Sequence, residues 1–175
     1  MKTSLKTIIS SLFLAFSFAC AGVDAFDGQS DDLQSNYEPT AQWKAVAAKA
    51  SALTKNPKAV NLTGGLASTK RHYDWTWTVM GEDGLYVTLS ASTSGVKVLH
   101  SEHRQTFVAP ALFTPDTLTV DSLDALNLLA KESCVKPGSL DLGGPVAGAA
   151  IRWAAECTET KMLFVDAVSG KVAKN

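Results

Sequence analysis

The chain has 175 residues, 46% of them hydrophobic, and its 16 basic side chains nearly balance 17 acidic ones. Such a near-neutral chain, without a cluster of Lys and Arg, lacks the charge of a nucleic-acid-binding protein, so no nucleic-acid partner is expected. Beyond the N-terminus, no segment has the run of about 20 apolar residues that a membrane-spanning helix needs.

The N-terminus is typical of a secretory signal peptide. Lys2 and Lys6 supply positive charge, and the uncharged apolar run Ile8–Ala19 follows. Small residues that suit cleavage come next. We expect a signal peptide over residues 1–21, with cleavage after residue 25 as the alternative, and a mature protein that is periplasmic or extracellular.

Cys20 raises the alternative of a lipid anchor, because bacterial lipoproteins carry a lipidated cysteine just after an apolar stretch. Ser17 and Phe18 stand where that pattern has Leu and a small residue. Free release is therefore the favoured outcome. Without residues 1–21 the chain keeps 14 basic and 17 acidic side chains, which is mildly acidic.

The first half predicts a helix followed by strands. Residues 22–38 are polar and predict a flexible leader. Apolar residues then recur at helical spacing between Pro39 and the Asn56-Pro57 pair, and residues 61–70 contain glycines and predict a loop. Strands are predicted by alternating apolar residues, and they cover Tyr73–Val79, 85–91 and 96–108.

The second half repeats this order. Asp121 and Ser122 suit the start of a helix, and Pro137-Gly138 suits its end. Residues 138–149 are rich in glycine and predict a second loop. Strands follow at about 150–157, 162–167 and 171–173.

The parallel between the halves predicts an internal repeat. Trp77 lies 18 residues before Gly95, and Trp153 lies 17 before Gly170. We expect an α+β fold of two α-β-β-β units, with antiparallel sheet and both helices on one face. Whether the units share one sheet is left open by the sequence.

The end of the chain resembles the PepSY domain family. The residues that carry the resemblance are Phe164-Val165-Asp166-Ala167-Val168-Ser169-Gly170-Lys171-Val172, and the first half matches more loosely through Leu85-Tyr86-Val87 and Ser94-Gly95-Val96. The resemblance implies two PepSY-like units, at 39–115 and 116–175. It also implies an exported protein linked with restraint of peptidases, and it carries no catalytic residues.

Cys134 and Cys157 are the two cysteines of the mature chain. An even number in an oxidising compartment predicts one disulfide bond. Two separate buried thiols are the alternative, because spacing alone does not supply the geometry of a bond.

No motif predicts catalysis or a cofactor. His100 and His103 are three apart on a predicted strand, so they point to opposite faces and are not expected to share a metal ion. Gly143-Gly144-Pro145 lacks the Lys-Ser/Thr ending of a phosphate loop. Asn61-Leu62-Thr63 is a glycan acceptor only in a eukaryotic host.

Four aromatic residues are the candidate binding residues: Trp75, Trp77, Tyr86 and Trp153. If exposed, they would form a patch for a peptide or protein; the alternative is that they build the core. The leading expectation is a non-enzymatic exported binding module that acts on a peptidase through a sheet face or edge. The alternative is a small-ligand carrier with a cystatin-like cavity between helices and sheet.

Overall fold

A computed structural model describes residues 38–65, 74–92, 94–134, 137–158 and 161–174. The predicted signal peptide, Cys20 and nearly all of the leader lie outside these residues. Within them the chain forms α2 (Pro39–Ser51), β1 (Lys58–Gly65), β2 (Asp74–Met80), β3 (Leu85–Ser92), β4 (Gly95–His103), the 3₁₀ turn η1 (Pro115–Thr117), α3 (Ser122–Lys131), β5 (Ser139–Gly143), β6 (Arg152–Thr158), β7 (Lys161–Asp166) and β8 (Val172–Lys174).

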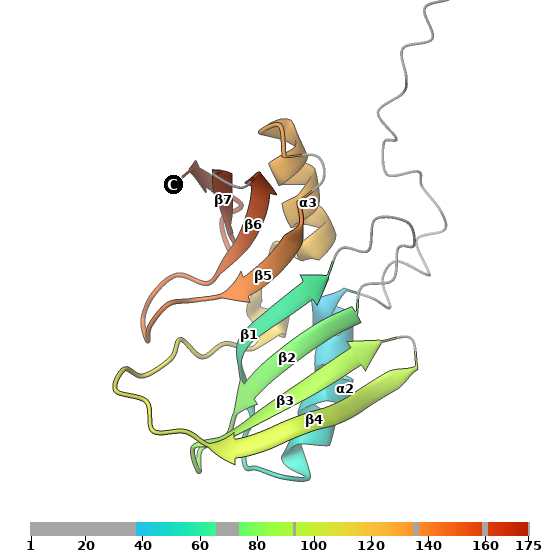
Figure 1. The fold of residues 1–175 in the computed structure, drawn as a ribbon, viewed down its shortest axis with the longest axis vertical. Coiled ribbons are helices and arrows are strands. Elements are labelled where there is room, and N and C mark those ends of the chain that lie inside the picture. Colours follow the sequence, from blue (N-terminus) through green and yellow to red (C-terminus); the bar gives the residue numbers. More distant parts are fainter. Residues whose placement is uncertain (1–37, 66–73, 93, 135–136, 159–160, 175) are drawn as a thin grey trace, which may run out of the picture.

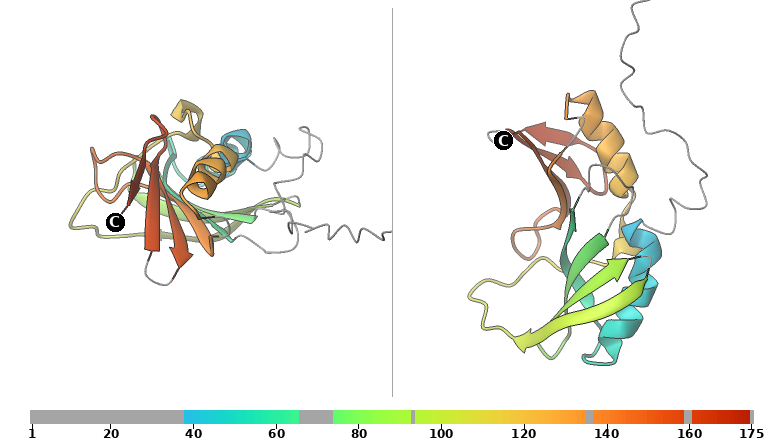
Figure 2. Two further views of the ribbon diagram at one scale, coloured as in Figure 1. Left: turned by 90° about the horizontal axis from the view of Figure 1, so that it is seen from above. Right: turned by 45° about the vertical axis from the view of Figure 1, so that its right-hand side comes forward.

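All eight described strands form one sheet in the order β4-β3-β2-β1-β5-β6-β7-β8, and every neighbouring pair is antiparallel. The first strand after each helix, β1 or β5, lies at the centre, and the later strands extend outward. Figures 1 and 2 show both helices on the same face of this strongly twisted sheet. The predicted α+β class, with antiparallel strands and helices on one face, is confirmed.

The two predicted glycine loops, 61–70 and 138–149, are wrong where they overlap strands. Residues 144–149 do form a loop, and residues 66–70 lie outside the described residues. Residues 58–65 and 139–143 are strands β1 and β5, and they pair with each other at the centre of the sheet. Glycine disfavours strands in isolation, but here neighbouring strands on both sides supply backbone hydrogen bonds. Each helix is therefore followed by four described strands, and the predicted strand 96–108 ends at His103.

The core lies between the helices and the sheet and is built around tryptophans. Trp75, Trp77 and Trp153 are fully buried. Trp43 of α2 lies over Trp77, with ring centroids 5.7 Å apart. The indole N–H of Trp153 donates to the carbonyl of Val120, at 2.9 Å, so its polar atom is satisfied inside the core.

Gly64 allows the two halves of the core to meet. It pairs with Trp75 across β1 and β2, and a Cβ atom at this position would lie 2.4 Å from the indole ring of Trp75. The Trp75 ring in turn packs against that of Trp153, at 5.9 Å between centroids. The Trp75 ring therefore occupies the space that a side chain at Gly64 would need, and it contacts Trp153 of the second half.

Candidate interaction surfaces

The four aromatic residues predicted to bind a partner do not form an exposed surface. The three tryptophans are core residues, which agrees with the second interpretation of the sequence. Tyr86 is on the opposite face of the sheet but is only 5% exposed. The Arg104 guanidinium lies 5.3 Å from the centre of its ring. A partner would have to contact other residues.

Over strands β1 to β5 the sheet face opposite the helices carries mainly polar residues, whereas over β6 and β7 it also carries Ala154, Met162 and Phe164. Strand residues alternate between faces, so those between the buried tryptophans and valines point away from the helices. One row of paired residues crosses five strands through Lys97, Ser90, Thr76, Thr63 and Asp141. The next row contains His100, Thr88, Thr78 and Asn61. Neither α2 nor α3 covers this face (Figure 2), and its short hydroxyl side chains offer hydrogen bonds.

Two neighbouring loops at one end of the sheet carry exposed apolar side chains. The loops are residues 104–114 and 144–151, and they project side by side (Figures 1 and 2). We call the exposed side chains the apolar loop patch: Phe107, Val108, Leu112 and Val146. Phe107 is as exposed as in an extended peptide, at 104%. Exposed apolar clusters of this kind mark interaction sites.

The apolar loop patch is held by contacts beneath it. The backbone N–H of Ala147 donates to the carbonyl of Ala109, at 2.9 Å, which joins the two loops. Phe113 exchanges two backbone hydrogen bonds with Ala59 at the start of β1. Ala111 is 3% exposed and packs so closely on Gly144 that an added Cβ would lie 2.7 Å from its side chain. The loops are therefore anchored to the sheet.

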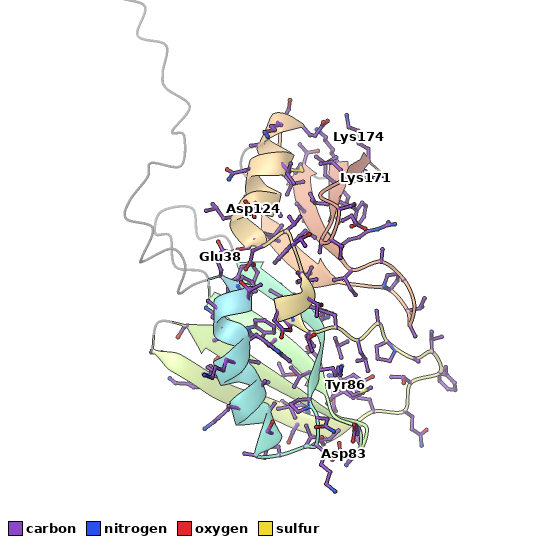
Figure 3. The ribbon with its side chains drawn as sticks, turned by 180° about the vertical axis from the view of Figure 1, so that it is seen from behind. Glu38, Asp83, Tyr86, Asp124, Lys171 and Lys174 are labelled. Carbon is purple, nitrogen blue, oxygen red and sulfur yellow. A yellow bond between two sulfur atoms is a disulfide. The ribbon has the colours of Figure 1, made fainter. Side chains whose placement is uncertain are left out.

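The first turns of the two helices meet, and each is capped by a residue of the other. Glu38, just before α2, accepts hydrogen bonds from the backbone N–H of Ser122, at 3.1 Å, and from its hydroxyl. Asp121, just before α3, accepts hydrogen bonds from the backbone N–H of Thr40, at 3.3 Å, and from its hydroxyl. Figure 3 shows Glu38 at this junction, near Asp124 in the first turn of α3. The exchange satisfies backbone donors at both helix starts.

Glu38 is an unusual acid in this junction. Burial raises its pKa to about 7, against an ordinary value of 4.5. The hydrogen bond from Ser122 opposes this shift, and the negative charge of Asp121 adds to it. The carboxyl group is therefore protonated in a large share of molecules at neutral pH.

This raised pKa predicts a stability that decreases between pH 4.5 and 7. Within that range the folded chain holds a proton on Glu38 that the unfolded chain has lost, so the free energy of unfolding falls as the pH rises. We expect a fall of about 2 kcal/mol, which is less than the full shift allows because the group is partly exposed. Urea unfolding at several pH values measures it. Glu38→Gln should remove this pH dependence, and Glu156→Gln, at an exposed site on β6, should keep it; equal pH profiles for both variants would contradict the assignment.

The disulfide bond between Cys134 and Cys157 is confirmed. It joins the chain just after α3 to β6, with Cα atoms 5.2 Å apart. Cys134 is buried and belongs to the core. The bond therefore attaches the end of α3 to the sheet of the second half.

The remaining motifs lie apart from one another. His100 is exposed on β4, with its Nε2 3.3 Å from the carboxylate of Glu102. In the described ranges no three His, Cys, Asp or Glu side chains are placed to hold a metal ion. Asn61 is exposed in the middle of β1. None of the described helices is long and apolar enough to cross a membrane.

Comparison with known proteins adds little. No protein-family model matches the chain, and no curated protein matches it. Among solved structures, the fold is similar to a crystal structure described as a "putative lipoprotein" from Clostridium difficile. The similarity covers 80% of this chain and all of the other, with 13% identity and a TM-score of 0.47. A likeness at this level supports no statement about function.

Proposed function

We propose that the chain is an exported, non-enzymatic binding module that docks a partner protein through the apolar loop patch and the adjoining helix-free sheet face. The observation that carries this proposal is the full exposure of Phe107 on a loop that is otherwise anchored. Exposing an aromatic side chain to water is unfavourable, and burying it in a partner's pocket would recover about 25 cal/mol for each Å² of apolar area.

The shape of the patch favours a concave partner. Two anchored loops project from one end of the sheet, so their side chains would enter a cleft. Preorganised loops lose little conformational entropy on binding. A peptidase, with its substrate cleft, is the partner class that the PepSY resemblance implies.

The alternative of a small-ligand carrier finds less support. A carrier needs open space between the helices and the sheet. In the described residues Trp43, Trp75, Trp77 and Trp153 lie in that space and are buried. Binding at the surface fits this filled core better than binding inside it.

We also propose that the fold arose from two related, PepSY-like units. Each described helix is followed by four antiparallel strands, and the strand order is symmetric about β1 and β5. The pairing of the first two strands of each unit also supports this origin: Gly64 of β1 pairs with Trp75 of β2, and Leu142 of β5 pairs with Trp153 of β6. This register makes Trp75, instead of Trp77, the counterpart of Trp153.

Export is supported by the disulfide bond, because such bonds persist in oxidising compartments. The covalent link between Cys134 and Cys157 is what the periplasm or the extracellular medium would maintain. A lipid anchor at Cys20 is the less favoured alternative, because Ser17 and Phe18 stand where the lipoprotein pattern has Leu and a small residue.

Affinity capture with the mature chain tests the proposed function. A protein partner from the extracellular or periplasmic extract should be retained by the wild-type chain, and about tenfold less by Phe107→Ser, because a buried aromatic anchor is worth more than 1 kcal/mol. Val168→Ser is the matched control, since Val168 is exposed in the β7–β8 turn, outside the patch. Capture of a small lipid or metabolite without any protein would overturn the proposal, as would equal capture by both variants.

A further inference from the structure

Strand β4 is an open edge of the sheet that is long and carries exposed apolar residues. Among the described residues it pairs only with β3, and it runs for nine residues, whereas the opposite edge strand β8 has three. Val98 and Leu99 are exposed on it, at 37% and 57%. Long edge strands with exposed apolar residues are templates for pairing with another strand.

A β-bulge at Leu99 changes which residues of β4 share a face. Val98 pairs with Leu89 and His100 with Thr88, so Leu99 is the extra residue. Bulges usually protect edges by bending them. Here the bulge also reverses the alternation, so that Lys97 and Glu102, five residues apart, both lie on the helix-free face, opposite Ser90 and Tyr86.

We propose that β4 pairs with β4 of a second copy of this chain, antiparallel and about a two-fold axis between Leu99 and His100. In this register Lys97 of each copy lies opposite Glu102 of the other, so the two-fold symmetry produces two charge pairs. Val98 lies opposite Ser101 and Leu99 opposite His100. The two eight-stranded sheets would become one continuous sheet, and the helix-free face would double in size.

The charges select this register over its neighbours. A shift of one residue would place Lys97 opposite Ser101 or His103, which lie on the other face of the strand. A shift of two residues keeps the faces but places Lys97 opposite His100, which has no carboxylate to pair with it, or opposite Arg104, which has the same charge. Like charges directly opposite are destabilising in a sheet. The proposed register is the one in which Lys97 faces a carboxylate.

The neighbours of Glu102 suit this role. The Arg104 guanidinium and the His100 ring lie beside its carboxylate within the same chain. Glu102 pairs with Tyr86, so its carboxylate lies on the helix-free face of the edge strand, the face on which Lys97 of the second copy would also lie. The apolar loop patch lies beyond the end of β4, so the dimer does not use its side chains. The inference shares only the helix-free sheet face with the proposed function, and it does not require a second protein.

Charge reversal tests the proposal with its own internal control. Sedimentation equilibrium of the mature wild-type chain across the micromolar range should show a dimer. Lys97→Glu and Glu102→Lys should each raise the dissociation constant about tenfold or more, because each variant replaces two attractions by two repulsions. The double variant Lys97→Glu/Glu102→Lys should restore the dimer, since the pairs are re-formed with reversed sign.

Controls separate a specific interface from general effects of charge. Lys171→Glu changes an exposed lysine in the β7–β8 turn and should leave the dissociation constant unchanged. Circular dichroism should show that every variant is folded. A monomer at all concentrations overturns the proposal, and so does a dimer that survives both single reversals or that the double variant fails to restore.

Discussion

Replacing Gly64 by alanine is expected to lower the free energy of unfolding by about 3 kcal/mol, which is at the upper end of the range for overpacked core sites. The added Cβ would lie 2.4 Å from the indole ring of Trp75, and neither group can easily move. The ring is fully buried and packs against that of Trp153. β1 is held by strands on both sides. The strain would therefore separate β1 from its neighbours at the centre of the sheet.

Urea unfolding measures this effect. Tryptophan fluorescence is a suitable signal, because Trp75 is buried in the folded chain and is the residue that the added Cβ would displace. Gly138→Ala is the matched control, since an added Cβ there meets nothing within 4 Å and the backbone is not left-handed. It should change the stability by less than about 0.5 kcal/mol. If both variants unfold at the same urea concentration, the close contact of Gly64 with the Trp75 ring does not contribute to stability as proposed.

Removing the disulfide bond is expected to cost about 3 kcal/mol, according to the chain-entropy model for a loop of this length. Cys134 and Cys157 are 23 residues apart, and the loop between them contains β5 and most of β6. Without the bond the unfolded chain gains freedom. The turn after α3 then depends on packing and on hydrogen bonds, which include the one from Lys161 Nζ to the carbonyl of Glu132, at 2.9 Å.

The comparison is between the oxidised chain and Cys134→Ala/Cys157→Ala. The midpoint of urea unfolding should fall in the double variant, and dithiothreitol should lower it in the wild-type chain by a similar amount. The reductant should have no effect on the double variant, which is the internal control. A wild-type midpoint that does not respond to full reduction, checked by thiol titration, would show that packing alone holds this junction.

Local patterns in the sequence were reliable where an element's residues decide its own conformation. The helix start at Asp121 follows from its capping side chain, which accepts a hydrogen bond from the backbone of Ser122. The alternation around Trp75 and Trp77 predicts strand β2, and the helix and strands β2 and β3 of the first half lie where the sequence places them. Strand β4 starts as predicted but ends at His103. The disulfide was also predicted correctly, since the chain beyond residue 21 contains one pair of cysteines.

The candidate surfaces were much less predictable. Exposure of an aromatic residue depends on which face of the sheet the helices cover, and in this fold they cover Trp75, Trp77 and Trp153. Residues 104–108 were predicted as the end of a strand, so their place in an anchored loop was missed. A uniform run of residues without charge from Gln105 to Pro115 was the one signal in the sequence.

The sequence by itself determined the two helices, the hairpins of β2 with β3 and of β6 with β7, and the mixed α+β class, because short-range periodicity and caps carry that information. Only the tertiary structure decided that glycine-containing segments become the central strands β1 and β5. Their conformation depends on partners distant in the sequence, above all Trp75 over Gly64 and the pairing between the halves. For the same physical reason, the tryptophans that the sequence offered for binding became the core, and the exposed side chains came from loops.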